Sequence, residues 1–192
     1  GCYAKMYNIT PESEPEIYAA SNRFATILEN VVVDRFNVPN YADSSLAENT
    51  RSSYPLSYIK DVVKSGVGSV PQQMFFLSAD AFGVLPPVSK LTTEQAMYYF
   101  LSGYTAKLGG TEVGLKEPVA AFSACFGAPF MIRKASVYAT LLGEYLQKHE
   151  ISVRLINTGW TGGKYGIGKR FPLKITRRII DAIQSGELNK QK

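Results

Sequence analysis

The sequence predicts an α/β domain built on a mixed β-sheet with flanking helices. Apolar, β-branched runs typical of buried strands alternate with segments of helical periodicity, and further strand-like segments come early in the chain. The 192 residues are 45% hydrophobic and 19% charged, which is enough to bury a sizeable core. We therefore expect residues 1–192 to form one domain or most of one, with no second domain in the chain.

The early segments predict strands, one helix and a surface turn. Residues 1–9 are typical of the end of a strand pair, and residues 28–34, LENVVVD, of a short β-branched strand. Residues 11–25 predict a helix whose first acidic side chains, Glu14 among them, suit the positive end of the helix dipole. The polar residues 37–45 predict a surface turn.

A buried strand is predicted at residues 73–79, with a helix after it. Asp80 follows the strand directly, where it either faces a ligand site or caps the turn, and the sequence leaves both roles open. Residues 92–95, TTEQ, have the form of a capping box, so the helix should begin there and end near Gly103. Residues 136–149 predict an amphipathic helix that packs on the sheet.

The glycine-rich residues 108–121 lie between these two predicted helices. Their periodicity is weak, which favours a mobile loop. Cys125, just beyond them, is expected to be a packed small residue and not a nucleophile.

The stretch around which the chain is organised is residues 157–177, NTGWTGGKYGIGKRFPLKITR. It continues from a predicted buried strand at residues 151–157. Its glycines allow the backbone to approach a ligand closely, and Lys164, Lys169 and Arg170 put three cations beside it. This combination suits a phosphate group.

Residues 163–169 also satisfy the P-loop pattern G-x-x-x-x-G-K, but we reject that interpretation. Arg170 stands where the motif needs a Ser or Thr hydroxyl for magnesium, and Pro172 interrupts the helix that would have to begin there. On local evidence alone, a basic surface turn is the alternative to a phosphate site.

Charge and cysteine content narrow the function classes. A net charge of +5, with basic residues gathered in the last quarter, favours an anionic small molecule over a nucleic acid. Cys2 and Cys125 lie far apart without a C-x-x-C pair, so we expect neither a disulfide framework nor a zinc site, and we predict a cytoplasmic location. No apolar run reaches the roughly 20 residues of a membrane span and no signal peptide opens the chain, so no membrane partner is expected.

Five strings, in order along the chain, carry a resemblance to a known family. They are GCYAK (1–5), ENTRSSYP (48–55), DAFGVLPPVSKLTTEQAMYYFLSGYTAK (80–107), FSACFGAPF (122–130) and the stretch 157–177. Together they resemble the ATP-dependent phosphoenolpyruvate carboxykinases nearly end to end. The resemblance implies part of the C-terminal nucleotide-binding domain of the carboxykinase fold, with residues 108–121 as a lid.

The resemblance implies a reaction as well as a fold. Oxaloacetate and ATP would give phosphoenolpyruvate, carbon dioxide and ADP, a step of gluconeogenesis, with Mg²⁺ on the nucleotide and Mn²⁺ at the substrate. The chain would be a fragment, because the family's N-terminal domain, true P-loop, manganese ligands and C-terminal tail are not in it. Its partner would be the missing half of the same enzyme, and the fragment alone is expected to be inactive.

Two matters stay open at this point. The sequence does not determine the oligomeric state, and a homo-oligomer is one of the open alternatives. The alternative function that we keep is a non-catalytic nucleotide-binding or interaction module that retains the binding residues without the chemistry.

The resemblance also implies roles for six residues. Arg51 and Lys5 would be catalytic, and Arg51 would in addition bind the substrate. The nucleotide-binding residues would be Glu14, Arg51, Arg170, Phe171 and Thr176, and no metal ligand would lie in the chain. Local chemistry allows plainer roles: a surface salt bridge for Arg51, a helix cap for Thr176 and a surface ion pair for Arg170.

Overall fold

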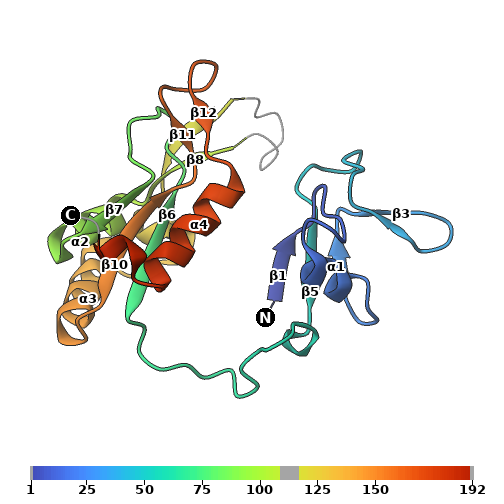
Figure 1. Cartoon of the computed structure of the whole chain (residues 1–192), viewed down its shortest axis with the longest axis horizontal. Coiled ribbons are helices and arrows are strands. Elements are labelled where there is room, and N and C mark those ends of the chain that lie inside the picture. The colour runs from blue at the N-terminus through green and yellow to red at the C-terminus, as the bar shows by residue number, and fades with distance from the viewer. Residues whose placement is uncertain (1, 109–116, 191–192) are drawn as a thin grey trace. The chain divides into compact units, whose positions relative to one another are not determined.

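The computed structural model describes residues 2–108 and 117–190, and it divides into two compact units (Figure 1). The first unit contains the described residues up to Val67, and the second contains those from Gly68 onward. Each unit has its own sheet and its own apolar core. The expectation of a single partial domain stays a prediction.

The first unit is built on a three-stranded antiparallel sheet with the order β1-β5-β2. Met6, Val31 and Tyr41 form the buried core, and Ile17 and Tyr18 pack against it from the helix α1. The elements are β1 Cys2–Lys5, α1 Pro15–Ser21, β2 Ile27–Glu29, the paired strands β3 Val32–Val33 and β4 Pro39–Asn40, β5 Arg51–Tyr54 and the 3₁₀ turn η1 Leu56–Tyr58.

Two expectations for this unit were wrong in extent. The helix is shorter than the predicted 11–25, because Thr10 and Ser13 hydrogen-bond to each other in a turn before it and Ala25 takes a φ of 63° after it. The predicted strand 28–34 is two strands, since Asn30 has a φ of 57° and breaks the extended backbone between β2 and β3. A left-handed residue ends a strand because it turns the chain out of the ladder.

The second unit has the mixed sheet that the sequence predicts. Its strand order is β6-β10-β7: β6 (Gln73–Ser78) runs parallel to β10 (Ser152–Asn157), and β7 (Val88–Leu91) runs antiparallel to it. The α/β class with a mixed sheet and flanking helices is thus confirmed.

The helices α2 (Thr93–Ser102) and α3 (Ala135–Lys148) cover one face of this sheet (Figure 1). Val153 and Leu155 of β10 pack there in one core with Phe76, Ala96 and Leu146. Arg154 points to the opposite face, since side chains alternate along a strand, and it donates a hydrogen bond to Asn189. That places η4 (Glu187–Lys190), which follows helix α4 (Leu173–Gln184), on the second face.

The helix termini follow the sequence signals closely. Thr92 and Gln95 form the reciprocal capping box at the start of α2, and Gly103 ends it with a left-handed φ of 53°. The remaining elements are β8 Tyr104–Lys107, β9 Val119–Phe122, the 3₁₀ turns η2 Ala124–Phe126 and η3 Ala128–Phe130, β11 Trp160–Thr161 and β12 Lys169–Arg170.

The predicted mobile loop at 108–121 is only partly open to comparison. Residues 109–116 lie outside the described residues. From Val119 the chain pairs with β8 as strand β9, so the predicted loop is too long at that end.

Cys125, beyond it, is buried with a free thiol, and burial raises its pKa, as expected for a packed side chain.

Candidate functional site

The carboxyl ends of β6 and β10 are held together by one buried amide. Asn157 Oδ1 accepts hydrogen bonds from the backbone N–H groups of Asp80 (3.1 Å) and Gly159 (2.8 Å). Its Nδ2 donates to the carbonyls of Leu85 (3.0 Å) and Trp160 (3.1 Å). The side chain is 1% exposed. Asn157 therefore ties the loop after β6 to the glycine-rich segment after β10.

Asp80 organises the loop after β6 from inside. Its Oδ1 accepts from the Phe82 N–H and the Tyr104 hydroxyl, both at 2.9 Å, and its Oδ2 accepts from the N–H groups of Val84 and Leu85, both at 2.7 Å. The carboxylate is fully buried. Of the two roles left open by the sequence, the structure supports capping of the turn.

The hydrogen bonds also set the charge state of Asp80. Burial by itself raises the pKa of a carboxyl group, but the donors from Leu85, Phe82, Tyr104 and Val84 outweigh it, so the pKa of Asp80 is lowered. Burial, together with the hydrogen bond to Asp80, raises the pKa of Tyr104 to about 12. The pair is thus a carboxylate and a neutral phenol at neutral pH.

The glycine-rich segment forms a hairpin and not a P-loop. Strands β11 and β12 pair Trp160 with Arg170 and Thr161 with Lys169, and α4 begins only at Leu173. This agrees with the rejection of the P-loop interpretation, because no helix follows the lysine directly.

Two glycines lie where the glycine-rich segment and the loop after β6 come into close backbone contact. A β-carbon at Gly159 would lie 2.2 Å from the backbone nitrogen of Asp80. One at Gly83 would lie 2.2 Å from the carbonyl oxygen of Gly163. In the described part of the chain, these glycines allow two loops of the protein to contact each other. The sequence had instead suggested that the glycines let the backbone approach a ligand.

Arg170 lies at the end of this hairpin with its side chain exposed. Its Nε donates to the Thr158 carbonyl at 3.2 Å, and its guanidinium carbon lies 5.8 Å from the centre of the Trp160 ring. Across the described residues it forms no ion pair with a carboxylate, so the surface-pair alternative finds no support. Trp160, 8% exposed, was missed as a supporting residue, although an aromatic residue inside a glycine-rich loop was a signal for it.

Phe171 and Thr176 follow on the same chain segment. The Phe171 N–H donates to the Gly159 carbonyl at 2.8 Å, and the side chain is half-buried. Thr176 is the fourth residue of α4 and is buried, while Pro172 is the N-cap. The helix-cap alternative for Thr176 is therefore wrong, because a cap at Thr176 would make Arg177 the first helical residue, whereas the helix begins four residues earlier, at Leu173.

In the first unit, Lys5 and Arg51 lie directly opposite each other in the β1–β5 ladder. Opposite residues of an antiparallel pair share one face, so these two cations are neighbours on the face away from the core residue Ser52. Lys5 is exposed, and the Arg51 side chain is 35% exposed.

Glu29 completes this cluster from the third strand. Its Oε2 lies 3.4 Å from Arg51 Nη1, and Asn49 Oδ1 accepts from Arg51 Nε at 3.4 Å. The salt-bridge alternative for Arg51 thus describes a real contact, but both contacts are long and leave Nη2 without an acceptor among residues 2–108 and 117–190. Sequence reasoning missed Glu29, since strand register cannot be read from the strand itself.

Glu14 is the N-cap residue of α1, and its side chain makes no capping hydrogen bond there. It is half-buried. The helix-dipole role proposed for it is compatible with this position.

Where the structure is described, no group of three or more His, Cys, Asp or Glu side chains could hold a metal ion, and no helix is long and apolar enough to cross a membrane.

Comparison with known proteins decides the family. The sequence profile described as Phosphoenolpyruvate carboxykinase matches residues 1–192. The chain belongs to the phosphoenolpyruvate carboxykinase family. The resemblance stated from the sequence strings is confirmed.

Individual carboxykinases show the same likeness. Phosphoenolpyruvate carboxykinase (ATP) of Thermus thermophilus is 58% identical over 189 residues, which are 98% of this chain and 36% of that protein. The corresponding protein of Agrobacterium fabrum is 57% identical over 188 residues, and these are 98% of this chain and 35% of the relative. That of Geobacter metallireducens is 55% identical over 190 residues. The chain thus spans about 35% of the length of the curated carboxykinases that it matches.

Proposed function

We propose that this chain supplies nucleotide-binding and catalytic residues of an ATP-dependent phosphoenolpyruvate carboxykinase. The enzyme would convert oxaloacetate and ATP to phosphoenolpyruvate, carbon dioxide and ADP in the cytoplasm, as a step of gluconeogenesis. The observation that carries the proposal, beside the family match, is the cross-strand pair of Lys5 and Arg51.

The Lys5–Arg51 pair fits the charge demands of this reaction. Like charges directly opposite each other in a ladder are destabilising, so a negative group in addition to Glu29 would stabilise the pair. A γ-phosphate supplies that charge. Phosphoryl transfer is accelerated by cations placed around the moving group, and the enolate left by decarboxylation is stabilised in the same way.

Arg51 has the donors for a role at both groups. Its planar fork can contact two oxygens at once, and its Nη2 is available. We assign Arg51 to the phosphate and the substrate, and Lys5 to the transferred phosphate.

The base and ribose are assigned to the second unit. The exposed guanidinium of Arg170 can stack on adenine, with Phe171 next to it in the chain. Thr176 is assigned to the same group of residues on the strength of the family match, as is Glu14 in the first unit.

The metal ions are assigned to other parts of the enzyme. We assign to this chain's residues the binding and orienting of anions, through the cations Lys5, Arg51 and Arg170. When bound, the metals would neutralise phosphate charge and polarise the substrate. The remainder of the same enzyme is accordingly the chain's proposed partner.

Turnover assays test the proposal. The full-length protein should release carbon dioxide from oxaloacetate in strict dependence on ATP, and the 192-residue chain alone should not, since it lacks a P-loop sequence. ATP binding by the full-length protein without any turnover would favour the non-catalytic module instead.

A further inference from the structure

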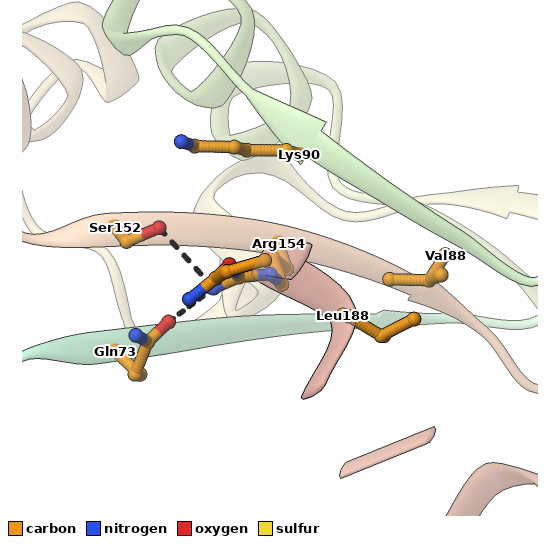
Figure 2. Close-up of a pocket in the computed structure, with 7 residues that line it drawn as sticks. Gln73, Val88, Lys90, Ser152, Arg154 and Leu188 are labelled. Carbon is orange, nitrogen blue, oxygen red and sulfur yellow. Dashed lines mark hydrogen bonds between the residues drawn. The ribbon is translucent and has the colours of Figure 1, made fainter. Parts of the chain in front are cut away.

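The second unit contains a cavity of about 570 Å³ on the sheet face that carries Arg154 (Figure 2). It is lined by Gln73, Val88, Lys90, Ser152, Arg154, Leu188 and Asn189. Ser152 and Asn157 are the two ends of β10, and at about 3.3 Å per residue they lie roughly 16 Å apart. The polar lining residues Gln73 and Ser152 therefore lie at the other end of the strands from the hairpin assigned to the nucleotide, while Val88, opposite Ile156, extends the lining along the sheet.

Arg154 is the central residue of this cavity. Its side chain is 4% exposed, and the guanidinium donates to Gln73 Oε1, to Ser152 Oγ (3.2 Å) and to Asn189 Oδ1 (2.7 Å). All three acceptors are neutral. No carboxylate pairs with Arg154 anywhere in the described part of the chain. A buried cation is costly without a counter-charge, and neutral oxygens offset that cost only in part.

Lys90 adds a second positive charge to the same place. It lies directly opposite Arg154 in the β10–β7 ladder, so both side chains stand on one face. Figure 2 shows the two extending in the same direction from neighbouring strands. Lys90 is exposed and has no ion pair with a described carboxylate. Two like charges in direct register repel each other, and an anion between them would reverse the sign of that interaction.

We propose that this cavity binds a small phosphate-bearing anion. Three of the five N–H donors of Arg154 hold its guanidinium in place, the other two have no acceptor among the described residues, and Lys90 supplies a movable point charge; this combination suits a phosphate dianion. The amide groups of Gln73 and Asn189 and the Ser152 hydroxyl add polar atoms around the anion. The volume falls in the range of small-molecule sites. The proposal does not depend on the carboxykinase assignment, which uses other residues.

The site is tested on the full-length protein by calorimetric titration with inorganic phosphate, at constant ionic strength, with and without saturating ATP. Lys90→Met is the main variant, because an exposed side chain can be replaced without loss of the fold. We expect one phosphate-binding event that persists with ATP and is weakened at least tenfold by Lys90→Met and lost in Arg154→Met. Lys148→Met, an exposed lysine in the last turn of α3, is the matched control and should bind phosphate as the parent does.

Three outcomes would overturn the proposal. They are equal phosphate affinity in the parent and Lys90→Met, no phosphate binding in the presence of ATP, and a crystal structure of the full-length protein in which another of its own carboxylates bonds to Arg154. Failure of ATP to bind would instead count against the carboxykinase assignment. Even then, weaker phosphate binding in Lys90→Met and its loss in Arg154→Met would support this site.

Discussion

The polar cluster on the first unit's sheet and the one behind the second unit's hairpin use their polar side chains in opposite ways. Asp80 and Asn157 are buried, and every oxygen and nitrogen of their side chains bonds to the protein itself. Lys5 and Arg51 are exposed to different degrees, and Arg51 keeps donors available. The difference teaches that a polar side chain can bind a ligand only where some of its hydrogen-bonding groups are not already bonded to the protein.

The largest effect should come from Arg51 in the full-length enzyme. We expect Arg51→Gln to lower kcat by about 100-fold or more and to weaken ATP binding much less, because a charge that strengthens its contact as the phosphoryl group moves acts on the transition state. Steady-state kinetics measure both. Arg35→Gln, which removes an exposed arginine of the same unit, is the control. An unchanged kcat with a raised KM would make Arg51 an ordinary binding residue.

The next largest effect should be on stability, at Asp80. In Asp80→Asn an amide N–H₂ would face two backbone donors, which leaves them unsatisfied, so we expect the free energy of unfolding to fall by about 3 kcal/mol. Urea unfolding followed by circular dichroism measures it. The exposed Asp61→Asn should stay within about 0.5 kcal/mol of the parent.

The pH dependence of that loss follows from the lowered pKa of Asp80. A carboxyl group whose folded-state pKa is depressed contributes stability above its unfolded pKa, near 4, and loses that contribution as the pH falls through its folded value. The gap between parent and Asp80→Asn should therefore be constant above about pH 5 and shrink below about pH 4. A gap that widens on acidification would show that the charge of Asp80 is not what stabilises the loop.

A smaller effect is expected at Arg170. Arg170→Ala in the full-length enzyme should weaken ATP by about 1–3 kcal/mol, the scale of a lost charged or stacking contact, and leave oxaloacetate nearly unchanged. Calorimetric titrations with each ligand decide, with the exposed Lys174→Ala as control. Equal weakening of both ligands, or of neither, would mean that the hairpin is scaffold like Asp80 and Asn157.

The smallest effect should come from Glu29. Its ion pair with Arg51 is long and exposed, so Glu29→Gln should change the free energy of unfolding by less than about 1 kcal/mol and the KM for ATP by less than about threefold. Thermal unfolding and kinetics on the same preparation measure the two. A large fall in kcat would show that Glu29 orients Arg51 and belongs to the cluster as a positioning residue.

Local signals in the sequence were enough to predict much of the fold. The capping box at Thr92, the left-handed end at Gly103 and the apolar run before Asn157 depend on neighbours a few residues away, and all three were confirmed. The break at Asn30 was not visible, because nothing nearby in the sequence distinguishes a left-handed asparagine from an extended one.

The candidate site was less accessible to such reasoning. That Lys5 meets Arg51, and that Arg51 meets Glu29, depends on the register of strands far apart in sequence. The carboxylate of Asp80 accepts from the hydroxyl of Tyr104, 24 residues away, and its backbone N–H donates to Asn157, 77 residues away. Family resemblance supplied the residue assignments, which remain proposals. The tertiary structure was needed to show which of these side chains have hydrogen-bond donors that the described protein does not use.

Trp160 gives the hairpin an optical consequence. It is the single tryptophan in the 192 residues; its ring is buried, meets Tyr165 edge-on and lies under the Arg170 guanidinium. Tryptophan fluorescence from this chain therefore comes from one known position. A nearby cation or a base stacked beside the indole changes the intensity of that fluorescence. In this chain, the residue that supports the proposed adenine contact is also its built-in fluorophore.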